Sequence, residues 1–215
     1  MLDEIFEKEK AMKHAKNEND HYADIYENWF KTKVWDVRNF LEIGVHKGGA
    51  LRAWAQYFPI ATIYGIDIKN KFDWEKTFDK KRIKFTVGDI TDINVVNKIY
   101  SGVEFDVIID DASHMVEDQI ITFLRMFQRV VFGGVYIVED IHTSYWPKFG
   151  GGYKRKNTFI EFVKDIIDMP NYWAYKITDR AEEYKIEEKI LWLEENIKSI
   201  SIYKGLCFIE RQDKT

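Results

Sequence analysis

The sequence predicts an α/β protein with a doubly wound, mostly parallel sheet. Five short apolar segments alternate with segments of helical periodicity, which is the pattern of right-handed βαβ units. A glycine-containing turn follows the first of these strands, and acidic residues stand at the ends of the next four. A length of 215 residues is enough for one domain with a full core and short for two, so a single domain over 1–215 is expected.

The first 36 residues are expected to form helices that pack on this core. Residues 2–12 predict a short charged helix, and residues 21–31 predict a second one. The second helix has aromatic and aliphatic residues at helical spacing, which would form one apolar face: Tyr22, Ile25, Tyr26, Trp29 and Phe30. Such a face suits either the core or a contact between copies of the chain in a homo-oligomer.

The predicted sheet and its helices follow in chain order. The expected strands are 39–45, 61–68, 82–90, 105–111 and 133–140, and the expected helices are 49–58, 92–100 and 116–131. Proline at 59 stops the first of these helices. Residues 198–211 predict a closing hairpin with its turn at Lys204-Gly205, which would add antiparallel strands at one edge.

Two segments after the fifth strand are less regular. Residues 141–157 predict one long irregular loop, whose length and glycine content suit a mobile lid or binding loop, although a plain surface loop has the same pattern. A helix at 158–169 should end before Pro170, and 181–196 predicts a highly charged helix. The sequence indicates no role for residues 171–197.

Composition excludes several classes of protein. The net charge of −4 argues against nucleic-acid binding, which needs a basic surface. No apolar run reaches the length of a membrane span, and the charged N-terminus lacks the apolar region of a signal peptide, so a cytoplasmic protein is expected. The single cysteine, Cys207, excludes an internal disulfide and lies in an apolar run typical of the core.

The glycine turn after the first strand occupies the position where doubly wound folds bind nucleotides. Gly44 ends the strand, and Gly48-Gly49 begins the helix. The spacing differs from G-x-G-x-x-G, and histidine stands at 46 where a pyrophosphate needs close backbone approach, so NAD is disfavoured. The pattern E-x-G-x-x-x-G, from Glu42, resembles the first motif of class I S-adenosylmethionine-dependent methyltransferases. A tight turn with glycines for packing alone is the alternative.

Two acids extend this interpretation. Asp67 ends the second strand, 23 residues after Gly44 (67 − 44 = 23), where a carboxylate can accept both ribose hydroxyls. Asp89 follows the third strand, where this superfamily contacts the adenine ring. Taken singly, either is equally a solvated strand-end acid or a helix cap.

Four carboxylates cluster at the ends of two strands expected to be neighbours. Asp110-Asp111 ends the fourth strand and Glu139-Asp140 ends the fifth. Carboxylates this close repel one another, and a divalent cation resolves the conflict. Oxygen ligands favour Mg²⁺, with Mn²⁺ and Ca²⁺ as alternatives. Capping of helices or pairing with lysines would also explain some of these acids.

Two stretches carry a more specific resemblance. "DDASHMVEDQIITF" and "GGVYIVEDIHTSYWPKFGG" resemble the metal-dependent sugar O-methyltransferases of the macrocin O-methyltransferase type, with their cephalosporin-hydroxylase-like relatives. "HYADIYENWF" and "FLEIGVHKGGALRAW" are also similar to that family, so the resemblance covers residues 21–152. It implies a Rossmann-like methyltransferase fold, S-adenosylmethionine as cofactor and a small-molecule or glycan acceptor.

The resemblance also implies roles for individual residues. Metal ligands would be Asp111, Glu139 and Asp140, and His114 would be the general base. The cofactor would contact Glu42, Gly44, Gly48, Asp67, Asp89 and Asp110. Independently of the resemblance, the aromatic residues of the 141–157 loop, Tyr145, Trp146 and Phe149, could stack on a sugar face and exclude water. The expected reaction is Mg²⁺-dependent methylation of a sugar hydroxyl on a glycan, nucleotide sugar or glycosylated natural product. A catechol-type or other small-molecule O-methyltransferase and a non-catalytic scaffold are the alternatives.

Overall fold

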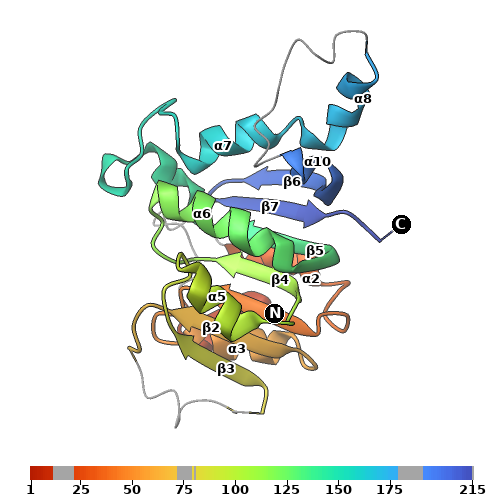
Figure 1. The fold of residues 1–215 in the computed structure, drawn as a ribbon. Coiled ribbons are helices and arrows are strands. Elements are labelled where there is room, and N and C mark those ends of the chain that lie inside the picture. Colours follow the sequence, from red (N-terminus) through yellow and green to blue (C-terminus); the bar gives the residue numbers. More distant parts are fainter. Residues whose placement is uncertain (12–21, 72–78, 80, 179–190, 215) are drawn as a thin grey trace.

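One seven-stranded mixed sheet organises the chain (Figure 1). The structure, a computed structural model, describes residues 1–11, 22–71, 79, 81–178 and 191–214. The strands are β1 (Asn39–Ile43), β2 (Thr62–Asp67), β3 (Ile83–Val87), β4 (Phe105–Asp110), β5 (Val130–Val138), β6 (Ile197–Tyr203) and β7 (Leu206–Arg211). Their spatial order is β3-β2-β1-β4-β5-β7-β6. The first five strands are parallel, and β7 pairs antiparallel with both β5 and β6. The predicted fold class is therefore confirmed.

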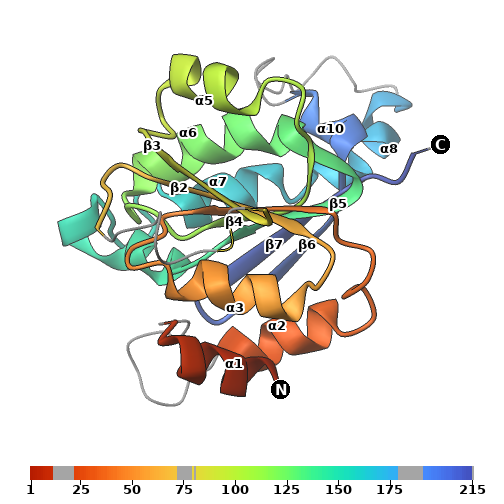
Figure 2. The ribbon, with the colours of Figure 1, turned by 90° about the horizontal axis from the view of Figure 1, so that it is seen from below.

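Helices cover both faces of the sheet (Figure 2). One face carries α1 (Leu2–Glu9), α2 (Tyr22–Phe30) and α3 (Gly49–Tyr57). The other carries α5 (Ile93–Tyr100), α6 (Val116–Met126) and α7 (Phe159–Ile166). Two separate clusters of buried apolar side chains lie between these layers and the sheet, because the strands are apolar on both faces.

The N-terminal helices pack on the core through one aromatic cluster. Trp54 of α3 is fully buried, and its ring lies 5.0 Å from Phe6 of α1, 5.3 Å from Tyr26 of α2 and 5.0 Å from Phe40 of β1, measured between centroids. The predicted apolar face of α2 is therefore part of the core rather than an exposed interface. Its members Tyr22, Tyr26 and Phe30 are buried.

Several element boundaries differ from the sequence-based expectations. Strand β1 ends at Ile43, because Gly44 adopts φ 88° and turns the chain. Strand β5 begins at Val130, three residues earlier than predicted, since the chain passes from α6 through the short 3₁₀ helix η1 (Phe127–Arg129). Helix α1 ends at Glu9 because Lys10 adopts a left-handed conformation, φ 54°.

The segment 141–157 is more ordered than an irregular loop. It contains the 3₁₀ helices η2 (Ile141–Tyr145) and η3 (Pro147–Phe149), and backbone hydrogen bonds from Gly151 and Gly152 close it on itself. Helix α7 begins after Thr158, whose hydroxyl accepts a hydrogen bond from the Glu161 amide.

Among the described residues near the C-terminus, three further short helices precede the hairpin: η4 (Met169–Asn171), α8 (Tyr172–Lys176) and α10 (Leu193–Asn196). The predicted helix at 181–196 falls largely on 179–190, outside the described residues. The hairpin and its turn at Lys204-Gly205 are confirmed. Cys207 is buried in β7, and burial raises the pKa of its thiol to about 12, as expected of a core residue. None of the described helices has the length and apolarity needed to cross a membrane.

Candidate active site

A cleft of about 1470 Å³ opens at the carboxyl ends of β1, β2 and β4. In open α/β sheets, ligands bind at this edge, where the strand order reverses. The predicted site residues that line the cleft are Glu42, Gly44, Asp67, Asp89, Asp110, Asp111, His114 and Asp140. Gly48, Glu139, Tyr145, Trp146 and Phe149 are not among its lining residues. Side chains of α1, including Phe6, form part of the wall.

The glycine turn brings β1 close to the end of β4. Gly44 has φ 88°, and a Cβ atom placed on it would lie 2.1 Å from the carbonyl oxygen of Asp111. Gly48 has φ 75° and precedes α3 as its N-cap residue. Gly44 therefore has a packing function of its own, since it lets the chain carrying Asp111 approach the cleft.

We expect Gly44→Ala to lower the free energy of unfolding by about 3 kcal/mol, from backbone strain together with the clash against Asp111. The matched control is Gly102→Ala, where φ is 76° but an added Cβ meets nothing within 4 Å. That variant has the strain alone, about 1 kcal/mol. Urea unfolding of the two variants measures the difference. Equal losses would contradict the close approach of the Gly44 turn to Asp111.

Asp67 holds the glycine turn closed. Its Oδ2 accepts hydrogen bonds from the amides of Val45 (3.1 Å) and His46 (2.9 Å), and its Oδ1 accepts one from Lys69 (3.0 Å). A carboxylate has about four acceptor positions, so these three bonds leave capacity toward the cleft. Asp89 is exposed, and its Oδ1 accepts from the amide and hydroxyl of Thr91.

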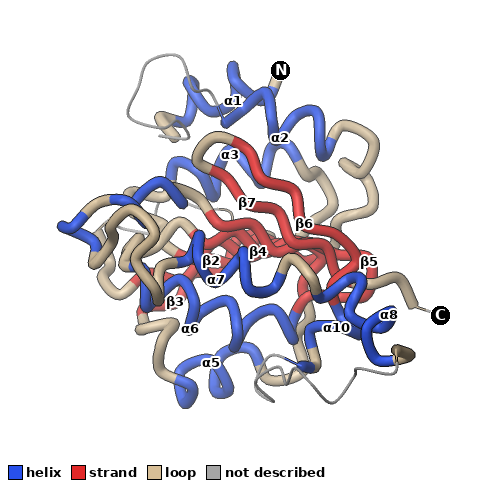
Figure 3. Tube along the Cα trace, turned by 90° about the horizontal axis from the view of Figure 1, so that it is seen from above, coloured by secondary structure: helices blue, strands red, loops and turns tan. Residues whose placement is uncertain are grey.

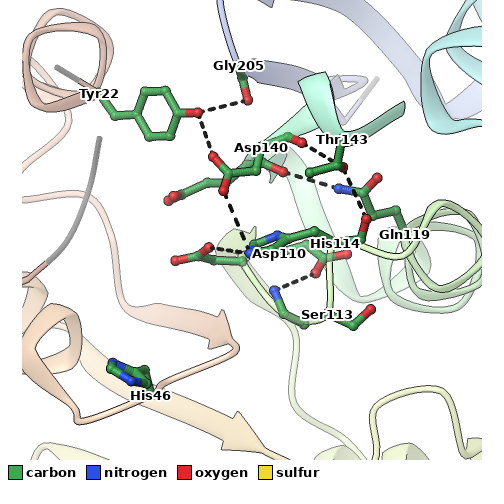
Figure 4. Close-up of polar contacts among 12 residues, drawn as sticks. Tyr22, His46, Asp110, Ser113, His114, Gln119, Asp140, Thr143 and Gly205 are labelled. Carbon is green, nitrogen blue, oxygen red and sulfur yellow. Dashed lines mark hydrogen bonds and ion pairs between the residues drawn. The ribbon is translucent and has the colours of Figure 1, made fainter. Parts of the chain in front are cut away.

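Three polar side chains meet beyond β4 and β5 (Figure 4). The Nε2 atom of His114 lies 3.9 Å from Asp111 Oδ1 and 3.7 Å from Asp140 Oδ2. One ligand atom from each residue lies within 4.8 Å of the others, a spacing that could hold a metal ion. All three side chains are partly exposed to the cleft, between 22% and 27%. His46 stands apart from this group in Figure 4.

The other two predicted acids point to tyrosines. Glu139 is buried, and its Oε1 accepts a hydrogen bond from Tyr26 (2.7 Å), while Glu139 is not part of the group of three. Asp110 is buried and accepts hydrogen bonds from the Tyr136 hydroxyl (3.1 Å) and the Ala112 amide (3.4 Å). Burial raises the pKa of Asp110 to about 7, against the effect of these two donors.

Two of the three grouped residues have left-handed backbones. His114 has φ 57° and Asp140 has φ 54°, a conformation that costs a non-glycine residue about 1–3 kcal/mol and that clusters at functional sites. Thr143 stabilises both residues, because its hydroxyl lies 3.1 Å from the His114 carbonyl and 2.8 Å from the Asp140 carbonyl. Gln119 donates to the carbonyl of Glu139 (3.2 Å).

The sequence-based interpretation missed four residues that contact the site: Tyr22, Tyr26, Gln119 and Thr143. The sequence predicts both tyrosines on the apolar face of a helix. A buried tyrosine hydroxyl usually has a hydrogen-bond partner, so the two tyrosines could be expected to bind a polar group. No sequence pattern identifies that group.

Of the predicted substrate-loop residues, Phe149 has a ring contact with His114 of the group of three. Its ring centroid is 6.2 Å from that of His114 and 6.0 Å from that of Trp146. Tyr145 is 43% exposed and Trp146 is 37% exposed, so both rings present apolar surface to solvent. Phe149 also lines a second cavity, of about 330 Å³, at the N-terminus of α6.

Comparisons with known proteins identify relatives of this chain. The chain is 32% identical over 192 residues to mycinamicin VI 2''-O-methyltransferase of Micromonospora griseorubida, which covers 82% of the chain and 45% of that protein. It is 35% identical over 200 residues to 8-demethyl-8-alpha-L-rhamnosyl tetracenomycin-C 2'-O-methyltransferase of Streptomyces olivaceus, covering 89% and 50%. The chain thus spans about half the length of these curated relatives.

The structure of the MycE methyltransferase from the mycinamicin biosynthetic pathway, solved with Mg, S-adenosylhomocysteine and mycinamicin VI, has the same fold. It superposes with a TM-score of 0.80 at 27% identity, covering 99% of this chain and 54% of that one. Residues 7–135, more than half of the chain, match the FtsJ-like methyltransferase family. The protein therefore belongs to the FtsJ-like methyltransferases and is related to the sugar O-methyltransferases that the resemblance had indicated.

Proposed function

We propose that this protein is an S-adenosylmethionine-dependent O-methyltransferase that uses Mg²⁺ and methylates a sugar hydroxyl of a glycosylated small molecule. The main observation behind the proposal is that Asp111, His114 and Asp140 lie close together at strand ends that border the cleft in which the cofactor would bind. The names of two relatives support a sugar acceptor, because they describe O-methyltransferases that act on mycinamicin VI and on a rhamnosyl tetracenomycin.

The cleft fits the cofactor. Asp67 would accept from the ribose, Asp89 would contact the adenine ring, and Glu42, Gly44 and Asp110 would lie along the amino-acid end, as the resemblance implies. Gly48 belongs to the same turn but does not line the cleft. The turn after β1 is held in place by Asp67 before any ligand arrives, so the cofactor would meet a preformed site. S-adenosylmethionine supplies a methyl group that its sulfonium already activates.

The two carboxylates of the group of three fit a hard divalent cation, which prefers oxygen ligands. Asp111 and Asp140 both face the cleft, and each offers a carboxylate oxygen within 4.8 Å of the other. Asp111 and Asp140 would hold the ion. Glu139, the third ligand that the resemblance implies, accepts a hydrogen bond from Tyr26 and lies outside the group of three, so it would have to turn toward the ion. Mn²⁺ and Ca²⁺ are alternatives to Mg²⁺. The bound cation would supply the charge that lowers the pKa of an acceptor hydroxyl.

His114 would remove the proton of that hydroxyl during methyl transfer. Its Nε2 atom faces the two carboxylates, whereas its Nδ1 atom is buried without a hydrogen-bond partner among the described residues. Only Nε2 is therefore presented to a reacting group.

The aromatic residues after β5 would position the acceptor. Phe149 lies beside His114, and the exposed rings of Tyr145 and Trp146 offer flat apolar surfaces of the kind on which a sugar face stacks. Ordering the acceptor there would bring one hydroxyl to His114 and exclude water from it. A catechol would satisfy the same metal chemistry, so the acceptor requires a direct experiment.

We expect calorimetry to show one S-adenosylhomocysteine site per chain, whether or not Mg²⁺ is present, because all the cofactor residues except Asp110 lie on or after β1, β2 and β3, whereas the metal group lies beyond β4 and β5. An assay of S-adenosylhomocysteine release would then compare glycosides and nucleotide sugars with a catechol. Release with a sugar alone supports the proposal, and release with the catechol alone moves the protein to the catechol class. Absence of any binding heat would point to a non-catalytic scaffold.

A further inference from the structure

Tyr22 of α2 reaches across the molecule to one acid of the metal group. Its hydroxyl donates a hydrogen bond to Asp140 Oδ1 at 2.8 Å, although the two residues are 118 positions apart in the sequence (Figure 4). The side chain is only 1% exposed, so it holds a single orientation between α2 and the sheet. Asp140 thus has one oxygen on Tyr22 and the other, Oδ2, 3.7 Å from His114.

The turn of the β6–β7 hairpin completes this contact. The carbonyl of Gly205 accepts a hydrogen bond from the Ile141 amide (3.1 Å) and lies 3.4 Å from the Tyr22 hydroxyl. A Cβ atom at position 205 would lie 2.2 Å from that hydroxyl oxygen. Glycine at this turn therefore leaves the space that the hydroxyl occupies, and Figure 3 shows the hairpin turn lying toward α2.

We propose that Tyr22 is a positioning residue that turns Asp140 so that Oδ2 faces the metal group, with Gly205 keeping its hydroxyl in place. This inference rests on the proposed function, since it assumes that Asp140 binds a cation. Hydrogen bonds from surrounding side chains are the usual means of orienting a metal-binding carboxylate.

Packing alone accounts for the ring of Tyr22 but not for its hydroxyl. Phe30, on the same helix, fills a fully buried position and has no hydroxyl. Tyr100 of α5 is equally buried, and its hydroxyl has no hydrogen-bond partner among the described residues, so the fold does not require one for every tyrosine.

Tyr22→Phe removes only the hydroxyl, and we expect it to weaken the affinity for Mn²⁺ or Mg²⁺ about 10–100-fold, the usual effect of losing a hydrogen bond to a metal ligand. Binding would be followed through the free Mn²⁺ signal in electron paramagnetic resonance, with Mg²⁺ as competitor. Affinity for S-adenosylhomocysteine should not change. In the assay, half-maximal activity should need more Mg²⁺, while kcat at saturating Mg²⁺ is largely restored. Tyr100→Phe is the matched control and should alter neither affinity.

Gly205→Ala tests the same contact without changing Tyr22. The added Cβ would displace the hydroxyl from Asp140, so metal affinity should fall as it does in Tyr22→Phe. Gly205 has φ 81°, so alanine there also strains the backbone. Gly102→Ala is the control for that strain, because Gly102 has φ 76° and open space around the added atom. The control should bind the metal as the parent chain does.

The outcomes separate this inference from the proposed function. A parent chain that binds no Mn²⁺ would remove the metal site itself. A parent chain that binds Mn²⁺, with Tyr22→Phe and Gly205→Ala binding it equally well, would overturn the inference and leave the metal site. Equal loss of metal and cofactor affinity, or failure of both variants to fold, would assign Tyr22 a purely structural function and would also overturn the inference.

Discussion

Alanine at His114 is expected to lower kcat by about 10²–10⁴-fold, the usual contribution of a general base. The imidazole is the only nitrogen base in the group with Asp111 and Asp140, so no other side chain of the group would accept the acceptor's proton at neutral pH. Cofactor affinity should persist, because the glycine turn and Asp67 are held by contacts that do not involve His114. Steady-state kinetics and calorimetry with S-adenosylhomocysteine measure the two effects separately.

The left-handed backbone of His114 calls for a second substitution. Alanine at φ 57° is strained, whereas asparagine tolerates this conformation better than most residues. His114→Asn should therefore be as inactive as His114→Ala and more stable. His142→Ala is the control, since that ring packs on Trp146 at 4.8 Å and is not part of the metal group. If His114→Asn kept its turnover, or if cofactor affinity collapsed in both variants, the assignment of His114 as base would be wrong.

The location of the site could be predicted because parallel strands share an edge. Acids after β4 and β5 must lie at the same end of the sheet as the glycine turn after β1, whatever the details of packing. The direction of each side chain could not be predicted in this way. Glu139 and Asp140 are adjacent in sequence, yet one is bonded to Tyr26 and the other faces His114, because the chain turns to φ 54° at Asp140.

Long-range contacts and short helices could not be predicted from the sequence either. The partner of Tyr22 depends on how α2 lies over the sheet, and no local pattern encodes that placement. The 3₁₀ helices in 141–157 are three to five residues long and have little periodicity to detect. The sequence predicts that β5 begins at residue 133, because Gly133-Gly134 is typical of a turn before a strand. In the structure Val130 already pairs with Phe105, and the register shifts after that pair.

Removal of divalent cations should abolish methyl transfer, and Mg²⁺ should restore it. Asp111 and Asp140 approach the same imidazole nitrogen, at 3.9 and 3.7 Å, so without a cation two negative charges surround the place where the acceptor must lose its proton. That field would raise the pKa of an acceptor hydroxyl and oppose its ionisation. Activity measured in excess EDTA, and again after Mg²⁺ is added back, tests this requirement. Full turnover in the chelator would exclude a catalytic metal.

Asp111→Asn separates the metal requirement from a general effect of EDTA. Asparagine preserves the shape of the side chain but removes one negative charge, so the Mg²⁺ concentration for half-maximal activity should rise at least about 10-fold. Asp118→Asn is the matched control, because Asp118 also lines the cleft but binds Ser113 and lies outside the group of three. A shift in Mg²⁺ requirement confined to Asp111→Asn places the ion at the ends of β4 and β5, whereas equal shifts in both variants would indicate only a diffuse attraction of cations to an acidic cleft.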